Sequence, residues 1–214
     1  MKTKLILASS SPRRREIFDN LGLEYEIITT NAEENADIRD MTPEQTVREL
    51  AIAKGRAIAE KISGCAGEDC VIVSADTVVA ASGKILEKPK NREEAREMLT
   101  SLSGKKHSVL TGLCVLEISS RCNKERTVVE KTDVYFKKLS EEMTEAYLDT
   151  GEYADKAGAY GIQGIGAMLV EKIKGDYFNV VGFPINSFYE LLKQEFSYDV
   201  FRPDEGFMKR RGKL

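Results

Sequence analysis

The sequence contains no tryptophan, one histidine and no long apolar run. None of its hydrophobic stretches approaches the roughly 20 residues needed to cross a bilayer, so we expect no membrane association. The stretch from Met1 to Leu7 is too short, and too soon followed by Arg13, for a secretory signal. We therefore expect a cytoplasmic protein. Its cysteines lack the close C-x-x-C pairing of zinc sites and are expected to be reduced thiols: Cys65, Cys70, Cys114 and Cys122.

The shortage of histidine also excludes several hydrolytic mechanisms. A serine or cysteine nucleophile with a histidine base would have to use His107, which lies in SGKKHSVLTG at the entrance of an expected strand. The chain has neither a G-x-S-x-G elbow nor a G-x-x-x-x-G-K-[ST] phosphate loop. Any hydrolysis is therefore expected to depend on carboxylates and a metal ion.

The net charge is small, but positive charge is concentrated near the N-terminus. A net charge of -3 argues against a large nucleic-acid-binding surface, so we expect no nucleic-acid partner. The segment LILASSSPRRREIFDNLG predicts a strand, a turn and a helix with Ser11 as N-cap and Pro12 at its first position. Arg13, Arg14 and Arg15 then occupy the first helical turn, where the helix dipole favours acidic side chains. This arrangement indicates a bound anion.

The order of the elements predicts an α/β fold. Strands alternate with helices in the first half and form hairpins later, which favours a mixed, strongly bent sheet flanked by helices, with a cleft between two lobes. We expect one domain over residues 1–196 and a flexible tail over 197–214, which lacks apolar periodicity. Helices are expected from Pro12 and over 43–62, 91–102, 140–150 and 184–196; a capping box of Thr42 and Gln45 starts the second, and Asn91 and Ser140 cap the third and fourth. Strands are expected over 25–30, 71–80, 107–118, 127–139, 167–173 and 177–182.

Lys54 lies in an unusual place on the helix expected over 43–62. Val47, Leu50, Ala51 and Ile58 fall on one side of this helix, and Lys54 lies in the middle of that apolar stripe. Such a lysine can extend its apolar stem over the stripe and keep its ammonium in water. Alternatively, it reaches into a pocket, which makes Lys54 a candidate for binding an anion.

Asp76 interrupts the apolar run VIVSADTVVA. It either lies at a strand edge in contact with water, or it is buried and needs a cationic partner or a role as a general base. Glu33 and Glu34, in an acidic loop, offer oxygen ligands for a hard divalent cation, although adjacent acids in a loop are often simply solvated. The carboxylates available for chemistry are therefore Asp76, Glu33 and Glu34.

GAYGIQGIG holds four glycines in nine residues. This density fits either a surface turn or a place where backbone closely approaches another group. Separately, ILEKPK places Lys88 just before a proline that keeps its backbone extended. Neither feature alone identifies a ligand.

Taken together, these segments resemble a known family. ASSSPRRREIFDNLG, VSADTVV, LEKPKNREEAREMLTSLSGKKHSVLTG, and DKAGAYGIQG followed by VVGFPI are similar to the Maf-type nucleoside triphosphate pyrophosphatases, in the same order, from about Leu5 to Phe196. The resemblance implies hydrolysis of a nucleoside triphosphate to its monophosphate and pyrophosphate, with a divalent cation, by an α/β protein that is often a dimer. The expected anion at the arginine-rich helix start is then a triphosphate, which helix N-termini bind well.

The resemblance also implies roles for particular residues. The family's base, the aspartate of its A-D-T motif, corresponds to Asp76, and the positions associated with substrate choice correspond to Arg13, Thr77 and Gln163. AYGIQG resembles the branch that acts on dTTP and UTP, as opposed to the branch that acts on 7-methyl-GTP. A glutamine amide offers one donor and one acceptor, which match O4 and N3–H of uracil or thymine but could also pair with adenine.

On this interpretation Asp76 activates water for attack at the α-phosphorus, helped by Mg²⁺ or Mn²⁺. Glu34 is the expected metal ligand and Glu33 the alternative. The phosphates are expected to contact Ser9, Arg14, Lys54 and Lys88, with Arg13 also contributing charge. The hydroxyl of Ser11 is expected to cap the helix.

The sequence is also compatible with three other functions. A sugar-phosphate phosphatase could use the same carboxylates and release orthophosphate. A nucleotide-sensing protein in cell-division control could bind without turnover, although the presence of Asp76 and Lys54 argues against this. A nucleic-acid reader is disfavoured by the negative net charge. A homodimer that binds a nucleoside triphosphate is the expected assembly.

Overall fold

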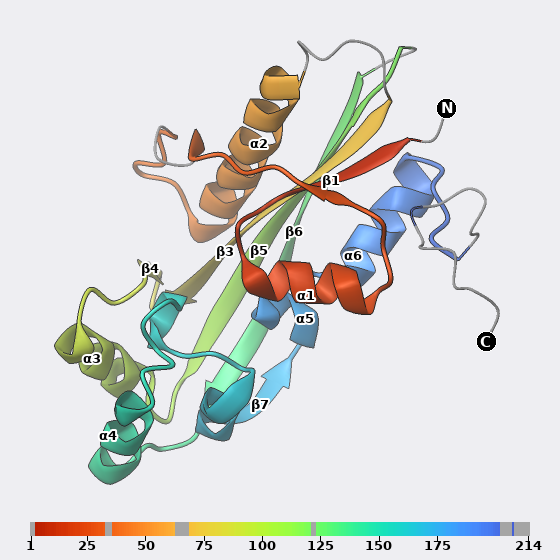
Figure 1. Ribbon diagram of the computed structural model, residues 1–214. Coiled ribbons are helices and arrows are strands. Elements are labelled where there is room, and N and C mark those ends of the chain that lie inside the picture. Colours follow the sequence, from red (N-terminus) through yellow and green to blue (C-terminus); the bar gives the residue numbers. More distant parts are fainter. Residues whose placement is uncertain (1–2, 33–35, 63–68, 121–122, 202–206, 208–214) are drawn as a thin grey trace, which may run out of the picture.

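The structure is a computed structural model and describes residues 3–32, 36–62, 69–120, 123–201 and 207 (Figure 1). Its strands are β1 (Lys4–Ala8), β2 (Glu26–Ile27), β3 (Cys70–Ala81), β4 (Lys84–Leu86), β5 (Lys106–Ile118), β6 (Asn123–Phe136) and β7 (Val170–Lys174). Its α-helices are α1 (Pro12–Asn20), α2 (Pro43–Ile62), α3 (Arg92–Leu102), α4 (Glu141–Asp149), α5 (Tyr177–Val181) and α6 (Ile185–Glu190). Short 3₁₀ helices η2 (Ala157–Ala159) and η3 (Gly164–Leu169) and a π-helical turn η4 (Leu191–Glu195) complete it.

The strands form one mixed sheet of seven strands in the order β2-β1-β3-β5-β6-β7, with β4 paired to β3. β1 runs parallel to β2 and β3, whereas the other pairs are antiparallel. This confirms the predicted mixed sheet flanked by helices. β3 therefore lies inside the sheet, where its Asp76 pairs in register with Gly112 of β5.

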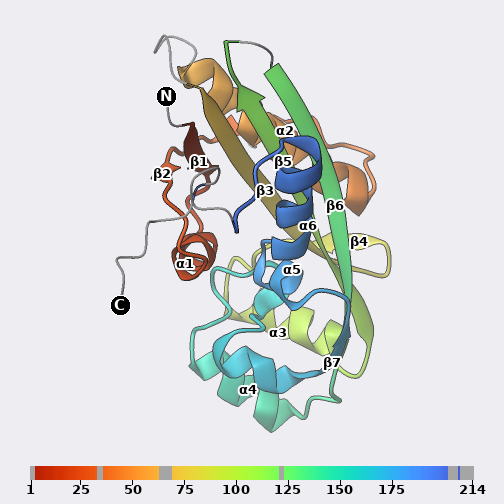
Figure 2. The same cartoon turned by 90° about the vertical axis from the view of Figure 1, so that its right-hand side faces the viewer.

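Helices cover both faces of the sheet, α2 on one and α1 and α6 on the other (Figures 1 and 2). The alternation along β1 explains this arrangement, since successive side chains of a strand point to opposite faces. Leu5 and Leu7 join the core cluster beneath α1 and α6, whereas Ile6 and Ala8 join the cluster beneath α2. A further cluster packs α3 and α4 against the other end of the sheet, which gives the molecule two lobes.

Three helix starts form as their sequence signals predicted. Thr42 and Gln45 make a reciprocal capping box, with Thr42 N donating to Gln45 Oε1 at 2.9 Å and Gln45 N donating to Thr42 Oγ1 at 3.3 Å. Asn91 caps α3 by accepting from Glu94 N, and Ser140 caps α4 by accepting from Met143 N. These local bonds explain why the helix boundaries could be predicted from sequence.

Other local predictions were wrong. The apolar run 177–182, expected as a strand, is helix α5, which Asp176 caps at its start and which ends at Gly182 in the left-handed region (φ 117°). A short apolar run has no periodicity that distinguishes strand from helix, so the caps decided the outcome. The strand expected over 167–173 starts only at Val170, after η3, and the strand expected over 25–30 is two residues long.

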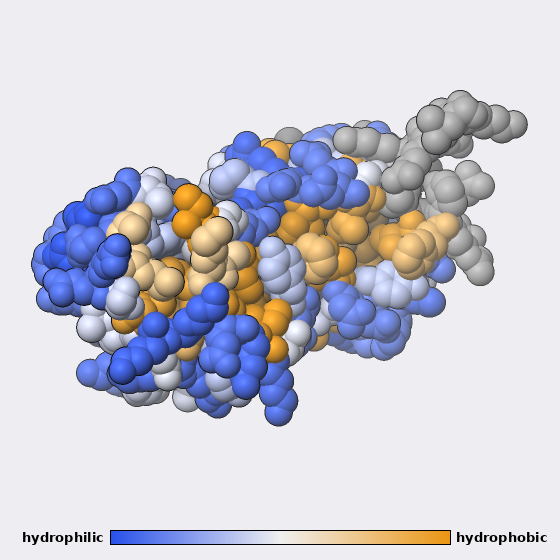
Figure 3. Space-filling view, turned by 90° about the horizontal axis from the view of Figure 1, so that it is seen from below, coloured by the Kyte–Doolittle hydropathy of each residue, from blue (hydrophilic) through white to orange (hydrophobic). Residues whose placement is uncertain are grey.

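Charged residues dominate much of the surface, but hydrophobic side chains are exposed in the middle of the face in Figure 3. The exposed large hydrophobic residues of η3 and α5 are Ile165, Met168, Tyr177 and Phe178. Within the described part of the chain, no helix is long and apolar enough to cross a membrane.

The described part of the C-terminal segment contacts the domain. Tyr198 and Val200 pack against the core cluster beneath α1 and α6, and Phe207 is buried in it. Glu24 N also donates to Phe207 O at 2.6 Å. The flexibility expected for residues 197–214 as a whole stays a prediction.

Candidate active site

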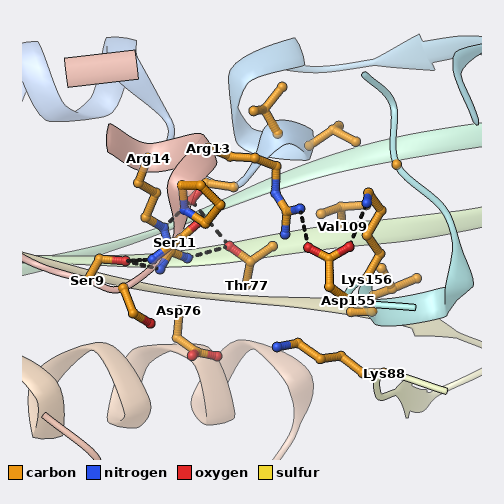
Figure 4. Close-up of a pocket in the computed structure, with 18 of the residues that line it drawn as sticks. Ser9, Ser11, Arg13, Arg14, Asp76, Thr77, Lys88, Val109, Asp155 and Lys156 are labelled. Carbon is orange, nitrogen blue, oxygen red and sulfur yellow. Dashed lines mark hydrogen bonds and ion pairs between the residues drawn. The ribbon is translucent and has the colours of Figure 1, made fainter. Parts of the chain in front are cut away.

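A pocket of about 340 Å³ opens between the start of α1, the middle of β3 and the glycine-rich segment (Figure 4). Eight side chains selected from the sequence line it: Ser9, Arg13, Arg14, Lys54, Asp76, Thr77, Lys88 and Gln163. Glu33 and Glu34, the expected metal ligands, lie outside the described residues. The fold thus brings together residues that are far apart in the sequence, from Ser9 to Gln163, although their chemical roles remain predictions.

Lys54 and Asp76 form a close ion pair at the pocket floor. Lys54 Nζ lies 2.7 Å from Asp76 Oδ1, and the two side chains are only 14% and 16% exposed. Asp76 comes from an inner strand, so it is not the solvated edge residue that the sequence allowed. Lys54 does not extend into bulk water either, because its ammonium is directed to this carboxylate.

Close packing of α2 on the sheet positions Lys54 beside Asp76. Ser74 Oγ donates to Ala51 O at 2.7 Å, which joins β3 to α2 one helical turn before Gly55. A Cβ on Gly112 would lie 2.1 Å from Val47 O, and one on Gly55 would lie 2.6 Å from Leu116 Cδ1. Side chains at these two glycines would push α2 outward, and Lys54 with it.

Arg14 is buried in the pocket wall and joins three segments. Its Nε donates to Gly182 O at 2.8 Å, and its terminal nitrogens donate to Ser9 Oγ at 3.2 Å and Thr77 Oγ1 at 3.1 Å. Ser9 Oγ also accepts from Ser11 N at 3.2 Å. The hydroxyl of Ser11 makes no cap hydrogen bond, so its expected capping role is wrong.

Thr77 is held from the opposite side by buried polar groups. Thr111 Oγ1 donates to Asn179 O at 3.2 Å and lies 2.9 Å from Thr77 Oγ1. Thr77 Oγ1 also lies 3.4 Å from Gly182 O, to which it can donate, and it accepts from Arg14. The Thr77 hydroxyl is therefore engaged by protein groups on both sides.

Asp155 and Lys156, which the sequence reasoning did not select, complete the other side of the pocket. Asp155 accepts from Arg13 at 3.1 Å through Oδ2 and from Lys156 Nζ at 2.6 Å through Oδ1 (Figure 4). Burial raises the pKa of Asp155, but the hydrogen bond and charge of Lys156, followed by Arg13, outweigh this and lower that pKa below its ordinary value. The available signal was their place in the motif DKAGAYGIQG.

The pocket is strongly cationic. Lys88 extends its ammonium toward Asp76 (Figure 4). Five cationic side chains, Arg13, Arg14, Lys54, Lys88 and Lys156, line the pocket against two carboxylates, Asp76 and Asp155. The start of α1 contributes the positive end of its dipole. Such a surface suits a compact ligand with several negative charges.

His107 does not line this pocket. It is buried with Nε2 2.7 Å from the hydroxyl of Tyr160, whose ring does line the pocket. Burial lowers the pKa of His107 to about 4, so its imidazole is neutral near pH 7.

Gln163 lines the pocket from the glycine-rich segment. It is half-buried and occupies the N-cap position of η3, yet its side chain makes no cap hydrogen bond.

Among the residues that the structure describes, no three histidine, cysteine or acidic side chains cluster as a metal site.

Fold and pocket together are those of an α/β protein with a cationic cleft. The chain belongs to the family of Maf-like proteins, whose family model matches residues 4–195. It is 46% identical over 193 residues to a dTTP/UTP pyrophosphatase of Thermoanaerobacter sp. (strain X514), covering 90% of this chain and 97% of that protein. It is also 46% identical over 196 residues to a dTTP/UTP pyrophosphatase of Thermococcus kodakarensis, covering 92% and 98% of the two chains.

Solved structures also resemble this chain at a lower level. The structure of a HAM1 protein from Coxiella burnetii is 14% identical, with a TM-score of 0.38, over 64% of this chain and 75% of that one.

Proposed function

We propose that this protein hydrolyses dTTP and UTP to the monophosphate and pyrophosphate. Relatives that are 46% identical over about nine-tenths of this chain are named dTTP/UTP pyrophosphatases. The observation that carries the proposal is the Lys54–Asp76 pair in a cationic pocket, because it places a carboxylate where a bound triphosphate would lie.

In the proposed mechanism Asp76 takes a proton from water that attacks the α-phosphorus. The new oxygen–phosphorus bond forms as the bond from the α-phosphorus to its bridging oxygen breaks, and pyrophosphate leaves with the electron pair. Lys54 would meet charge developing on the α-phosphate, and Lys88 and Arg13 charge on the leaving group. Arg14 and Ser9 would shape the wall that the phosphates contact.

We also propose that the protein uses a divalent cation, Mg²⁺ or Mn²⁺. Carboxylate and phosphate oxygens are the donors that such hard cations take. Glu34, or Glu33 in its place, is the proposed carboxylate ligand. When bound, the cation would offset negative charge on the phosphate oxygens.

Base selection is assigned to Gln163, with Arg13 and Thr77 shaping its surroundings. A glutamine amide can accept from N3–H and donate to O4 of uracil or thymine. Thr77 already accepts from Arg14 and lies 2.9 Å from Thr111 Oγ1, so we assign it to holding the pocket wall.

The test is a panel of normal and modified triphosphates with both phosphate products identified. We expect UTP and dTTP to be turned over, with pyrophosphate released in step with the monophosphate. Release of orthophosphate would instead indicate a phosphatase, binding without turnover a nucleotide sensor, and preference for 7-methyl-GTP the other branch.

We further propose a homodimer that acts in the cytoplasm and does not bind nucleic acid. The exposed hydrophobic residues of η3 and α5 support self-association, because exposed apolar patches often mark interfaces. The net charge of -3 disfavours a nucleic-acid partner. Sedimentation at several protein concentrations tests the dimer, and a single monomeric species throughout would reject it.

A further inference from the structure

Glu152, outside the pocket, holds the segment that carries Gln163. It follows α4 and is half-buried. Its two carboxylate oxygens accept from the backbone of η3, Oε2 from Ile165 N and Oε1 from Gly166 N, both at 3.0 Å. These contacts span 13 and 14 residues of sequence, so they are tertiary contacts and not a local turn.

The bonded amides are those that a helix start leaves without a partner. The first N–H groups of a helix find no carbonyl in the helix, and the N-cap side chain usually accepts from them. Gln163 occupies the N-cap position and makes no such bond. Glu152 fills this role from a distance, with charge-assisted hydrogen bonds to both amides. The amide of Gln163 is therefore left for another partner.

Two glycines let the segment close around this carboxylate. Gly164 has φ +70°, and a Cβ there would lie 2.7 Å from Glu152 Oε2. A Cβ on Gly166 would lie 2.3 Å from Gly161 O and 2.9 Å from Glu152 Oε1. The glycine density that the sequence left ambiguous thus provides a close backbone approach, and the group approached is this carboxylate as well as the segment's own backbone.

Glu152 is also tied to the pocket through its backbone. Lys156 Nζ donates to Glu152 O at 2.7 Å and to Asp155 Oδ1 at 2.6 Å. Asp155 in turn pairs with Arg13. The carboxylate that caps η3 is therefore anchored to residues that line the pocket beside Gln163.

We propose that Glu152 is a positioning residue for base selection, which acts by capping η3 and thereby fixing where Gln163 presents its amide. The inference rests on the proposed pyrimidine triphosphate activity. Glu152 does not line the pocket, so it acts on the substrate only through the segment it holds.

The first experiment compares Glu152→Ala and Glu152→Gln with wild type and with Glu171→Gln, a matched control on the exposed part of β7. Glu152→Ala removes both acceptors, and we expect kcat/KM for UTP and dTTP to fall roughly 10-fold further than for CTP, mainly through KM. Glu152→Gln retains one acceptor oxygen, so its loss of kcat/KM should lie between those of wild type and Glu152→Ala. This variant replaces Glu152→Ala in the test if the alanine variant does not fold. Glu171→Gln should match wild type.

A double variant tests whether Glu152 acts through Gln163. If it does, adding Glu152→Gln to Gln163→Ala should cause little further loss of UTP selectivity, because the amide being positioned is already absent. Losses of selectivity that multiply in the double variant would overturn the proposal. Equal loss on UTP, dTTP and CTP in the Glu152 variants would also overturn it.

Amide hydrogen exchange gives a readout that does not depend on substrate. The amides of Ile165 and Gly166 should exchange faster in Glu152→Gln than in wild type, and their exchange rates should be unchanged in Glu171→Gln. Unchanged exchange would mean that Glu152 does not cap η3. Failure of wild type to hydrolyse any pyrimidine triphosphate would instead reject the proposed function, and with it the selectivity role, while the exchange result would still decide the cap.

Discussion

Lys54 Nζ of α2 lies 2.7 Å from Asp76 Oδ1 of β3, so a helix on one face of the sheet reaches across to a carboxylate on an inner strand. Neither side chain is more than 16% exposed. This pair unites the two features that are hardest to explain as purely structural, a lysine within an apolar helix stripe and an aspartate within an apolar strand.

Replacing Asp76 with asparagine should abolish most turnover. The amide keeps the shape of the carboxylate but cannot take a proton, so we expect kcat to fall about 100-fold or more while nucleotide binding persists. Steady-state kinetics and calorimetric titration with a slowly hydrolysed analogue check this. Near-normal turnover would remove Asp76 from the role of base.

Lys54→Ala should lose activity and keep the fold. The apolar stripe tolerates a shorter side chain, but Asp76 loses its 2.7 Å partner, so we expect a moderate fall in Tm with the fold retained while kcat/KM falls about 100-fold. Lys61→Ala, at an exposed position in the last turn of the same helix, is the control and should retain activity. A large drop in Tm with activity retained below it would make Lys54 structural.

Gln163→Ala should reduce activity selectively. Removing the amide leaves the O4 and N3–H edge partly unsatisfied, at a cost of about 1–3 kcal/mol. The loss should be much greater for UTP and dTTP than for CTP, whose edge presents a donor in place of O4. The measurement is kcat/KM for each triphosphate at one metal concentration. A uniform loss would mean that Gln163 shapes the segment and reads no base.

Arg14→Lys should destabilise the protein as well as impair it. A lysine cannot reproduce the guanidinium geometry that bridges Gly182 O, Ser9 and Thr77, so buried acceptors lose their donors at a cost of about 1–3 kcal/mol. Urea unfolding measures this free energy. Arg15→Lys, at an exposed position one residue further, is the control and should change stability little. Equal stability of the two variants would contradict the bridging role.

His107 should make unfolding stability depend on pH. Its pKa is lowered by burial from 6.5 to about 4, so between these values the unfolded chain binds the proton that the folded protein excludes. Stability is therefore retained above about pH 6.5 and lost as the pH falls toward 4, by about 3 kcal/mol in total. Urea unfolding at pH 7 and pH 4.5 should show a smaller difference for His107→Gln than for wild type. The same difference in both proteins would contradict this assignment.

Local structure was predictable wherever the signal was itself local. The capping box of Thr42 and Gln45 and the caps Asn91 and Ser140 predicted three helix starts because their bonds span only a few residues. The short apolar run 177–182 carried no comparable periodic signal, and its assignment as a strand was wrong.

The candidate site likewise has features that the sequence revealed and others that it did not. The sequence by itself determined which residues were anomalous: cations at a helix start, a lysine in an apolar stripe and an aspartate in an apolar strand, each costly unless a partner is present. Only the tertiary structure decided the partners. Arg13 pairs with Asp155, 142 residues away, and Glu152 accepts from amides 13 and 14 residues away. Such contacts depend on how distant segments pack, so they leave no regular spacing in the sequence that could be detected.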